Sequence, residues 1–250
     1  MGNIIMPLGK TRYICVFLLL SAGIAAQSTA NTEAGQRAIS EARANLGSFS
    51  IDITEVTIGQ FRNYARKHGI ITAAEREGGG FEWGSGWERR RGWTYLAPFG
   101  VLGGDNEPAV HISFAEAEAY CKAAGGFLPN KQQWQLAAYT EMRASPPRPF
   151  ENGRTYLYPT GENEGRANVS GDADGWARHA PVGSTGAGIN GLFDAGGNVW
   201  EWLSDASGEE RLTAGGSWWY DQAKMKVDGM QYKPAKFYAV YVGFRCAYMN

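Results

Sequence analysis

The sequence predicts a mixed globular domain in which short helices and short strands are separated by long, tryptophan-anchored loops. Glycine accounts for 34 of the 250 residues, and aromatic residues make up 13% of the chain. Because glycine interrupts regular elements, this composition favours a loop-rich globule over a helical bundle. Capping signals for helices and an alternating stretch typical of a strand indicate that both kinds of element occur.

The first 30 residues have the layout of a secretory signal peptide. Lys10 and Arg12 precede an apolar run over residues 13–26, and Ser28 and Ala30 place small residues at positions −3 and −1 of a cleavage site. An uncleaved anchor is the less favoured alternative, because the run is short for a membrane span. We therefore expect a periplasmic or secreted protein without stable membrane insertion after cleavage.

Cleavage would divide the chain into a signal peptide (residues 1–30), a flexible lead-in (residues 31–47) and one domain (residues 48–250). The lead-in is polar and rich in alanine. The chain has 24 basic and 25 acidic residues, and no basic run is long enough to indicate a nucleic-acid surface. We expect a monomer that binds no nucleic acid.

The domain begins with signals for a strand and a helix. Residues 49–53 alternate in polarity, which is typical of a strand. Thr57 and Gln60 then form a capping-box pattern at the start of a helix that ends at Gly69.

Two further helices carry the same kind of signal. Ser113 and Glu116 form a capping box before a helix over residues 114–124. Asn130 is the expected N-cap of a third helix over residues 131–142.

Residues 78–100 are predicted to form a long surface loop, because they contain too much glycine for a regular strand or helix. Aromatic side chains would anchor this loop; they are Phe81, Trp83, Trp87, Trp93, Tyr95 and Phe99.

Residues 194–202 bring two carboxylates and two tryptophans into one short segment. Its end predicts a strand with Trp200 and Trp202 on one face. Asp194 and Glu201, with backbone carbonyls between them, would suit a hard cation such as calcium. The alternative is a turn aspartate that caps its own backbone and a glutamate that pairs with an arginine.

Three motifs near the C-terminus, in this order, carry a specific resemblance. They are Gly-Asn-Val-Trp-Glu-Trp at residues 197–202, Gly-Gly-Ser-Trp at residues 215–218 and Gly-Phe-Arg-Cys-Ala at residues 243–247. The chain resembles the sulfatase-modifying-factor family, named after the formylglycine-generating enzyme, over roughly residues 49–247. The resemblance implies an irregular α+β fold related to C-type lectins, with little regular secondary structure and a small antiparallel sheet.

Cleavage would leave two cysteines, Cys121 and Cys246. In an oxidising compartment such a pair is either a disulfide or two inert buried thiols. The family resemblance implies a structural disulfide between these two positions.

The resemblance also implies two structural calcium sites built from side-chain oxygens and backbone carbonyls. Carried over by position, the ligands are Asn168, Val169, Asp174 and Trp176 in the first site, and Asp194, Gly197, Val199 and Glu201 in the second.

The family's oxidase reaction requires a cysteine pair shortly after the Gly-Gly-Ser motif, and copper(I) binds such soft thiolates. This chain has Tyr220 and Met225 at the two positions. Neither side chain supplies a thiolate, so we expect no copper binding and no formylglycine generation, and we assign no catalytic residue.

Trp218, Trp219 and Tyr220 are the candidate ligand-binding residues. Together with nearby lysines they form an aromatic and cationic segment suited to a peptide or an aromatic ligand. The alternative is a core edge with solvated lysines; those lysines are Lys224, Lys226, Lys233 and Lys236.

Three functions remain as alternatives. The preferred one is an exported family protein that binds, or helps mature, a secreted peptide, in the way that the resemblance implies for relatives acting on pyoverdine-type siderophores. The second is a non-catalytic C-type-lectin-like binding module, and the third is a formylglycine-generating oxidase that acts on sulfatases by displaced chemistry. A secreted peptide or protein is the expected partner.

Overall fold

The computed structural model describes residue 35, residues 41–171 and residues 174–250. The predicted signal peptide and most of the predicted lead-in lie outside the described residues. Within the described ranges, no helix combines the length and apolar character needed to cross a membrane.

The described part of the chain contains short helices and three small sheets, with many of its residues in irregular segments. The order of strands is β1-β2-β9 in the first sheet, β3-β4 in the second, and β7-β6-β5-β8 in the third. The strands are β1 (Arg43–Asn45), β2 (Phe49–Asp52), β3 (Gly79–Trp83), β4 (Trp87–Arg91), β5 (Trp200–Ser207), β6 (Glu210–Ala214), β7 (Gln231–Pro234), β8 (Val242–Gly243) and β9 (Ala247–Met249). The helices are α2 (Ile58–His68), α3 (Ala73–Arg76), α4 (Phe114–Ala123) and α5 (Lys131–Tyr139), with 3-10 turns η1 (Ile189–Gly191), η2 (Gln222–Met225) and η3 (Val227–Gly229).

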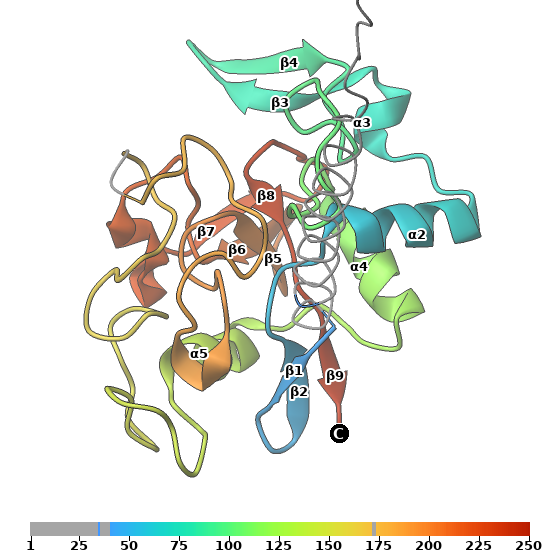
Figure 1. Cartoon of the computed structure of the whole chain (residues 1–250). Coiled ribbons are helices and arrows are strands. Elements are labelled where there is room, and N and C mark those ends of the chain that lie inside the picture. Colours follow the sequence, from blue (N-terminus) through green and yellow to red (C-terminus); the bar gives the residue numbers. More distant parts are fainter. Residues whose placement is uncertain (1–34, 36–40, 172–173) are drawn as a thin grey trace, which may run out of the picture.

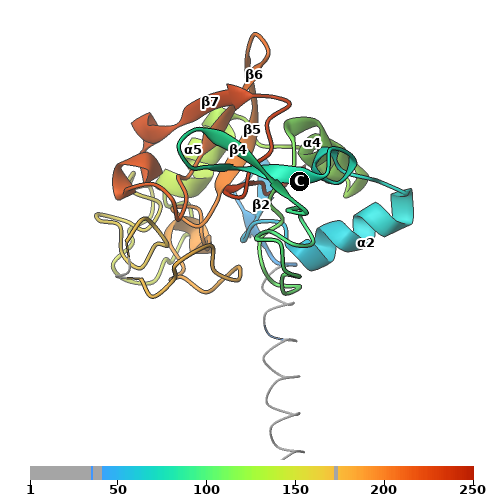
Figure 2. The ribbon, with the colours of Figure 1, turned by 90° about the horizontal axis from the view of Figure 1, so that it is seen from above.

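The four-stranded sheet occupies the middle of the molecule, between the β3–β4 hairpin at one end and the β1-β2-β9 sheet at the other (Figure 1). Helices α2 and α4 lie on one side of it, and long irregular segments lie on the other; the view from above shows the same division (Figure 2). Strand β5 contributes Trp200, Trp202 and Leu203, all fully buried. The first half of β5 is therefore buried on both faces, whereas its second half is mostly exposed.

The predicted flexible lead-in is wrong at its end, because Arg43–Asn45 forms strand β1. Ala44 pairs with Ile51 across the antiparallel β1–β2 ladder, and Ala44 and Leu46 are buried. Two apolar side chains spaced for one face of a strand gave a signal that the polar composition of the segment obscured.

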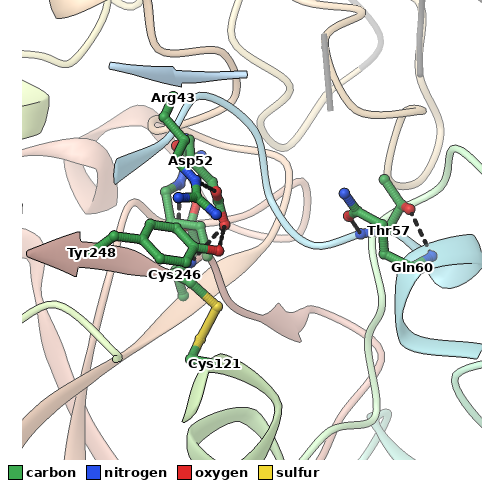
Figure 3. Close-up of a disulfide and its surroundings, with 9 residues drawn as sticks. Arg43, Asp52, Thr57, Gln60, Cys121, Cys246 and Tyr248 are labelled. Atoms are coloured by element: carbon green, nitrogen blue, oxygen red, sulfur yellow. Dashed lines mark hydrogen bonds and ion pairs between the residues drawn. A yellow bond between two sulfur atoms is a disulfide. The ribbon is translucent and has the colours of Figure 1, made fainter. Parts of the chain in front are cut away.

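The disulfide between Cys121 and Cys246 is confirmed, with 5.4 Å between the two Cα atoms. It joins helix α4 to the chain just before β9 (Figure 3). Beside it, the Asp52 carboxylate accepts hydrogen bonds from the backbone N–H of Cys246 and from the hydroxyl of Tyr248. Strand β2 and the last strand, β9, therefore meet beside the disulfide that leads to α4.

The predicted helix starts are confirmed. Thr57, Ser113 and Asn130 are the N-caps of α2, α4 and α5, and each helix has its capping box. Gly69 ends α2 in the left-handed conformation at φ 65°. The helix starts were predictable because the two partners of each capping box lie within three residues of one another.

The predicted loop over residues 78–100 is wrong in its first part, because β3 and β4 form a regular antiparallel hairpin there, whereas residues 92–100 are irregular. A Cβ atom on Gly79 would lie 2.0 Å from the carbonyl oxygen of Arg90, and one on Gly80 would lie 2.0 Å from Nδ1 of His111. The glycines are needed for close approach to the partner strand and to a buried histidine.

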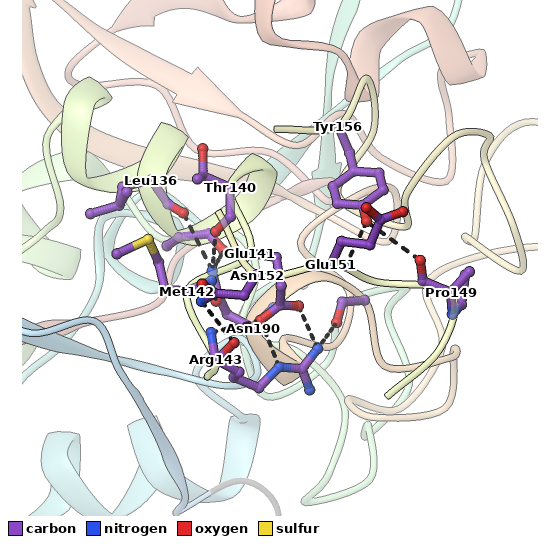
Figure 4. A network of polar contacts seen from close by, with 12 residues as sticks. Leu136, Thr140, Glu141, Met142, Arg143, Pro149, Glu151, Asn152, Tyr156 and Asn190 are labelled. Atoms are coloured by element: carbon purple, nitrogen blue, oxygen red, sulfur yellow. Dashed lines mark hydrogen bonds and ion pairs between the residues drawn. The ribbon is translucent and has the colours of Figure 1, made fainter. Parts of the chain in front are cut away.

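Helix α5 ends at Tyr139, earlier than predicted, because Asn190 caps it from a distant segment (Figure 4). The Asn190 amide nitrogen donates to the carbonyls of Leu136, Ala137 and Thr140, and its oxygen accepts the N–H of Met142. Asn190 itself has a positive φ of 55°.

We predict that Asn190→Ala lowers the free energy of unfolding by about 2–4 kcal/mol, through lost buried hydrogen bonds and a left-handed backbone that alanine tolerates poorly. Asn190→Gly removes the same bonds but accepts the backbone conformation, so it should cost about 1–2 kcal/mol less. Urea unfolding of the two variants measures the difference. An equal loss would show that backbone conformation contributes nothing at this position.

Candidate ligand-binding site

A cavity of about 460 Å³ opens between the β3–β4 hairpin and strand β7. Phe81 and Trp87 come from the hairpin, Phe237 and residues 231–234 come from β7 and the turn after it, and Tyr220 comes from the segment after the Gly-Gly-Ser motif. The Trp87 and Phe237 rings meet edge to face, 4.6 Å between centroids. We call this cavity the aromatic pocket; its size and lining are typical of a small-ligand site.

Tyr220 and Met225, which the resemblance places at the positions of the family's cysteine pair, have separate environments. Tyr220 lines the aromatic pocket and packs against Trp200 and Tyr241, with centroid distances of 5.5 and 5.9 Å. Met225 is fully buried in a cluster with Tyr158. The arrangement offers no thiol for metal-dependent redox chemistry at these two positions.

The three ligand-binding candidates also differ in position. Tyr220 belongs to the pocket wall. Trp218 is buried and packs against Phe99, whereas Trp219 is 41% exposed and does not contribute to the described lining. The structure therefore assigns one of the three to the aromatic pocket.

Among the described residues that line the pocket, Lys233 is the only basic one. The residue is only 8% exposed, and its Nζ lies 4.3 Å from the centroid of the Trp200 ring. It donates a hydrogen bond of 3.2 Å to Oε1 of Gln231. Burial, with a smaller contribution from the positive charge of Lys224, lowers the pKa of Lys233 to about 7.

The second predicted calcium segment contains a buried ion pair. Both oxygens of Glu201 accept hydrogen bonds from Arg245, each 2.7 Å long. The Asp194 carboxylate accepts from the N–H of Gly183 and the hydroxyl of Thr185. A cation at this segment would therefore compete with Arg245 for Glu201 and with two donors for Asp194.

A third carboxylate, Glu55, approaches the same segment. It is buried, its Oε1 accepts from the side-chain amide of Asn198, and its Oε2 has no hydrogen-bond partner. Burial and the negative charges of Asp194 and Glu201 raise the pKa of Glu55 well above its usual range. Burial likewise raises the pKa of Asp194 and of Glu201, with Arg245 opposing the shift in both.

The first predicted calcium segment offers one free oxygen. Oδ1 of Asn168 is buried without a hydrogen-bond partner, while its amide nitrogen donates to the carbonyl of Arg178. The two oxygens of Asp174 accept the N–H groups of Val169 and Trp176. An unpartnered amide oxygen is a kind of ligand that calcium accepts, and the carboxylate and backbone carbonyls of the same segment are others.

The structure brings the two predicted segments together. The N–H of Asn198 donates to the carbonyl of Asn168, and a Cβ atom on Gly197 would lie 2.3 Å from that carbonyl oxygen. Val199 is fully buried beyond this contact. Among residues 35, 41–171 and 174–250, no group of three or more acidic, histidine or cysteine side chains converges as a metal site, so backbone oxygens would have to complete either set.

Sequence reasoning missed the contribution of the β3–β4 hairpin to the pocket and the burial of Lys233. The Gly-Ser-Gly sequence between Trp83 and Trp87 was an available hairpin signal. No local signal separates Lys233 from the other lysines of its segment, because Trp200 on another strand buries it.

The fold and the site geometry define a member of a known class of domain. A model of the sulfatase-modifying factor enzyme 1-like domain (FGE-sulfatase) matches residues 11–249. The chain therefore belongs to the sulfatase-modifying factor / formylglycine-generating enzyme family.

Its relatives carry several functional names. The formylglycine-generating enzyme of Streptomyces coelicolor is 32% identical over 195 residues, which cover 64% of this chain but only 58% of that relative. The inactive C-alpha-formylglycine-generating enzyme 2 of Mus musculus is 27% identical, with 80% of this chain and 74% of the relative covered. Hercynine oxygenases also match. The structure of PvdO from Pseudomonas aeruginosa shares the fold with a TM-score of 0.60 at 20% identity, over 81% of this chain and 80% of that chain.

We predict that Lys233→Met stabilises the protein most at low pH. An unfolded lysine has a pKa near 10.5 and the folded one near 7. Below pH 7 both states are charged and the wild-type protein carries the full burial penalty, of about 2–4 kcal/mol; the penalty fades as pH rises from 7 towards 10.5.

The stabilities of the two proteins at pH 6.5 and pH 9.5, from urea unfolding, measure this change. The exposed Lys236→Met variant is the matched control and should show no such trend. A gain for Lys233→Met that is the same at both pH values would contradict the burial of a charged amine.

Proposed function

We propose that this protein is an exported member of its family that binds, or helps to mature, a secreted peptide or protein without cysteine-bound copper. The aromatic pocket at the position of Tyr220 is the observation that carries this proposal. Aromatic walls suit side chains of a peptide, and their flat faces contribute binding with little loss of conformational freedom.

The absence of thiols supports binding without formylglycine chemistry. Tyr220 and Met225 stand at the cysteine positions, and Cys121 and Cys246 are bonded to one another. Cys15, the remaining cysteine of the sequence, belongs to the predicted signal peptide. A relative whose name states that it is inactive shows that the family is not restricted to active oxidases.

Export to the periplasm or medium, and action as a monomer, complete the proposal. The predicted signal peptide supports export, and the disulfide suits an oxidising compartment.

We predict that an aromatic peptide, such as fluorescein-labelled Gly-Phe-Gly-Tyr-Gly, binds the protein and that Tyr220→Ala weakens binding at least fivefold, because one wall of the pocket is removed. Fluorescence anisotropy measures the affinity. Trp219→Ala is the matched control, since it removes an exposed ring next in sequence that lies outside the described lining.

Two results would count against the proposal. One is failure of the peptide to bind, or equal binding by the Tyr220→Ala variant. The other is an aldehyde product, detected by mass spectrometry, from a Cys-x-Pro-x-Arg peptide incubated with the protein and copper, because this would establish the oxidase alternative.

We also propose that calcium supports the segment of residues 168–176 as a structural ion. Asn168 and Asp174 would hold it with side-chain oxygens, and Val169 and Trp176 with carbonyls; bound calcium would supply charge and fixed geometry to a loop with little regular structure. The second set, Asp194, Gly197, Val199 and Glu201, remains a further proposal that requires Arg245 to share Glu201.

We predict that calcium raises the melting temperature of the wild-type protein relative to the same protein in chelator, and that Asp174→Asn abolishes most of this increase. Asparagine can still accept a backbone hydrogen bond but lacks the charge that calcium requires. Glu164→Gln, an exposed charge-loss variant nearby, should keep the full response. An identical response in the Asp174→Asn variant would exclude the ion from this segment.

A further inference from the structure

We propose that the aromatic pocket recognises a carboxylate attached to an aromatic group, with Lys233 as the counter-ion and the surrounding rings as the seat of the aromatic group. The inference rests on the proposed binding function and specifies the chemistry of the ligand. The carboxylate could belong to a free aromatic acid or to the C-terminus of a peptide that ends in an aromatic residue.

Lys233 has unused hydrogen-bonding capacity at the edge of the cavity. Strand β7 directs it inward between the exposed Tyr232 and Pro234, and it is 8% exposed. An ammonium group has three N–H donors, and Gln231 accepts one of them. The remaining donors are available to a ligand that enters the aromatic pocket.

The surroundings of Lys233 lack a negative charge. No acidic residue belongs to the described lining, and no carboxylate of the described chain lies in ion-pair distance of its Nζ. The charged neighbours add to the imbalance, because Lys224 from η2 repels the ammonium and Arg211 lies opposite in the β6–β7 ladder. A buried cation without a partner is costly, and a ligand anion would remove that cost.

The residues behind Tyr220 and Lys233 also include polar groups without a partner. The Trp200 indole N–H and the Tyr241 hydroxyl are buried without partners. Both rings pack against Tyr220, and Lys233 lies over the Trp200 ring. Indole N–H and ammonium are donors only, so donors outnumber acceptors behind this wall of the pocket, and among these donors Lys233 is the one that lines the cavity.

The rest of the cavity suits an aromatic ring. Phe81 and Phe237 are stacked with 6.4 Å between centroids and 16° between planes, and Trp87 meets Phe237 edge to face. The cavity volume of about 460 Å³ exceeds the volume of one benzoate-sized group, so a ligand made of two or three such groups can enter. Ring contacts and one charge contact together select an amphiphilic ligand.

Protonation of Lys233 should make ligand binding at this site depend on pH. Burial lowers its pKa, and a bound carboxylate would raise it again, so binding takes up a proton when the free amine is neutral. Tyr220 faces the same cavity with a raised pKa and stays uncharged at neutral pH. Affinity for the carboxylate should therefore fall as pH rises from 6.5 to 9.

The test compares two matched pairs of ligands by isothermal titration calorimetry at pH 6.5 and 9. One pair is 2-naphthoate and 2-naphthamide; the other is acetyl-Gly-Gly-Phe as the free acid and as the amide. The wild-type protein should bind at least one acid about tenfold or more tightly than its amide at pH 6.5, as expected for a charge-assisted hydrogen bond. The pair that shows the preference identifies the source of the carboxylate.

Variants then assign the preference to one residue. Lys233→Gln should reduce acid binding to the level of the amide and remove the pH dependence, while Lys236→Gln, which loses the same charge at an exposed position, should behave like the wild type. Far-UV circular dichroism and melting temperature establish that each variant is folded. The comparison of acid with amide in the wild type needs no variant and stands if Lys233→Gln does not fold.

Equal affinity for acid and amide in the wild-type protein would overturn the inference. If both peptide forms also depended on Tyr220, the proposed peptide-binding function would stand without the carboxylate site. The inference would also be overturned if the Lys233→Gln variant kept the preference for the acid. Failure of all four ligands to bind the wild-type protein would overturn it as well.

Discussion

The buried pair of Arg245 and Glu201 is the interaction on which the rest of the structure depends. The guanidinium bonds both oxygens of Glu201 on the central strand, and it also donates to the carbonyls of Asp52 and Phe193. One side chain thus joins the last segment of the domain to its first sheet, its central sheet and its irregular region. Removing either charge would leave the other buried without a partner, which costs far more than an exposed pair contributes.

Arg245 also explains why a Gly-Phe-Arg-Cys-Ala motif and a Gly-Asn-Val-Trp-Glu-Trp motif occur together in one chain. The arginine of the first pairs with the glutamate of the second, and the neighbouring Cys246 bonds to Cys121. The shared framework is therefore held by contacts that do not involve the thiol positions of the oxidase. The same framework accommodates Tyr220 and Met225 at the two positions where the resemblance places the family's cysteines.

The sequence was informative where both partners of a contact are local or carried by a motif. Thr57 with Gln60 predicted the start of α2, and the motif resemblance predicted the fold and the disulfide. Prediction failed where the partner is distant. Asn190 ends α5 from some fifty residues away, and Gly79 and Gly80 accommodate atoms of another strand and of His111. Lys233 is distinguished from its neighbouring lysines only by Trp200, which belongs to another strand.

The covalent bond between Cys121 and Cys246 encloses more than half of the domain, including most of the long irregular region beyond α5 (Figures 1 and 3). A protease that cut the backbone once within this enclosed stretch would leave two fragments tied through sulfur. The strand pairing between β2 and β9 would hold the same two fragments non-covalently. After such a cut, the two fragments would therefore separate on a denaturing gel only if the disulfide had been reduced.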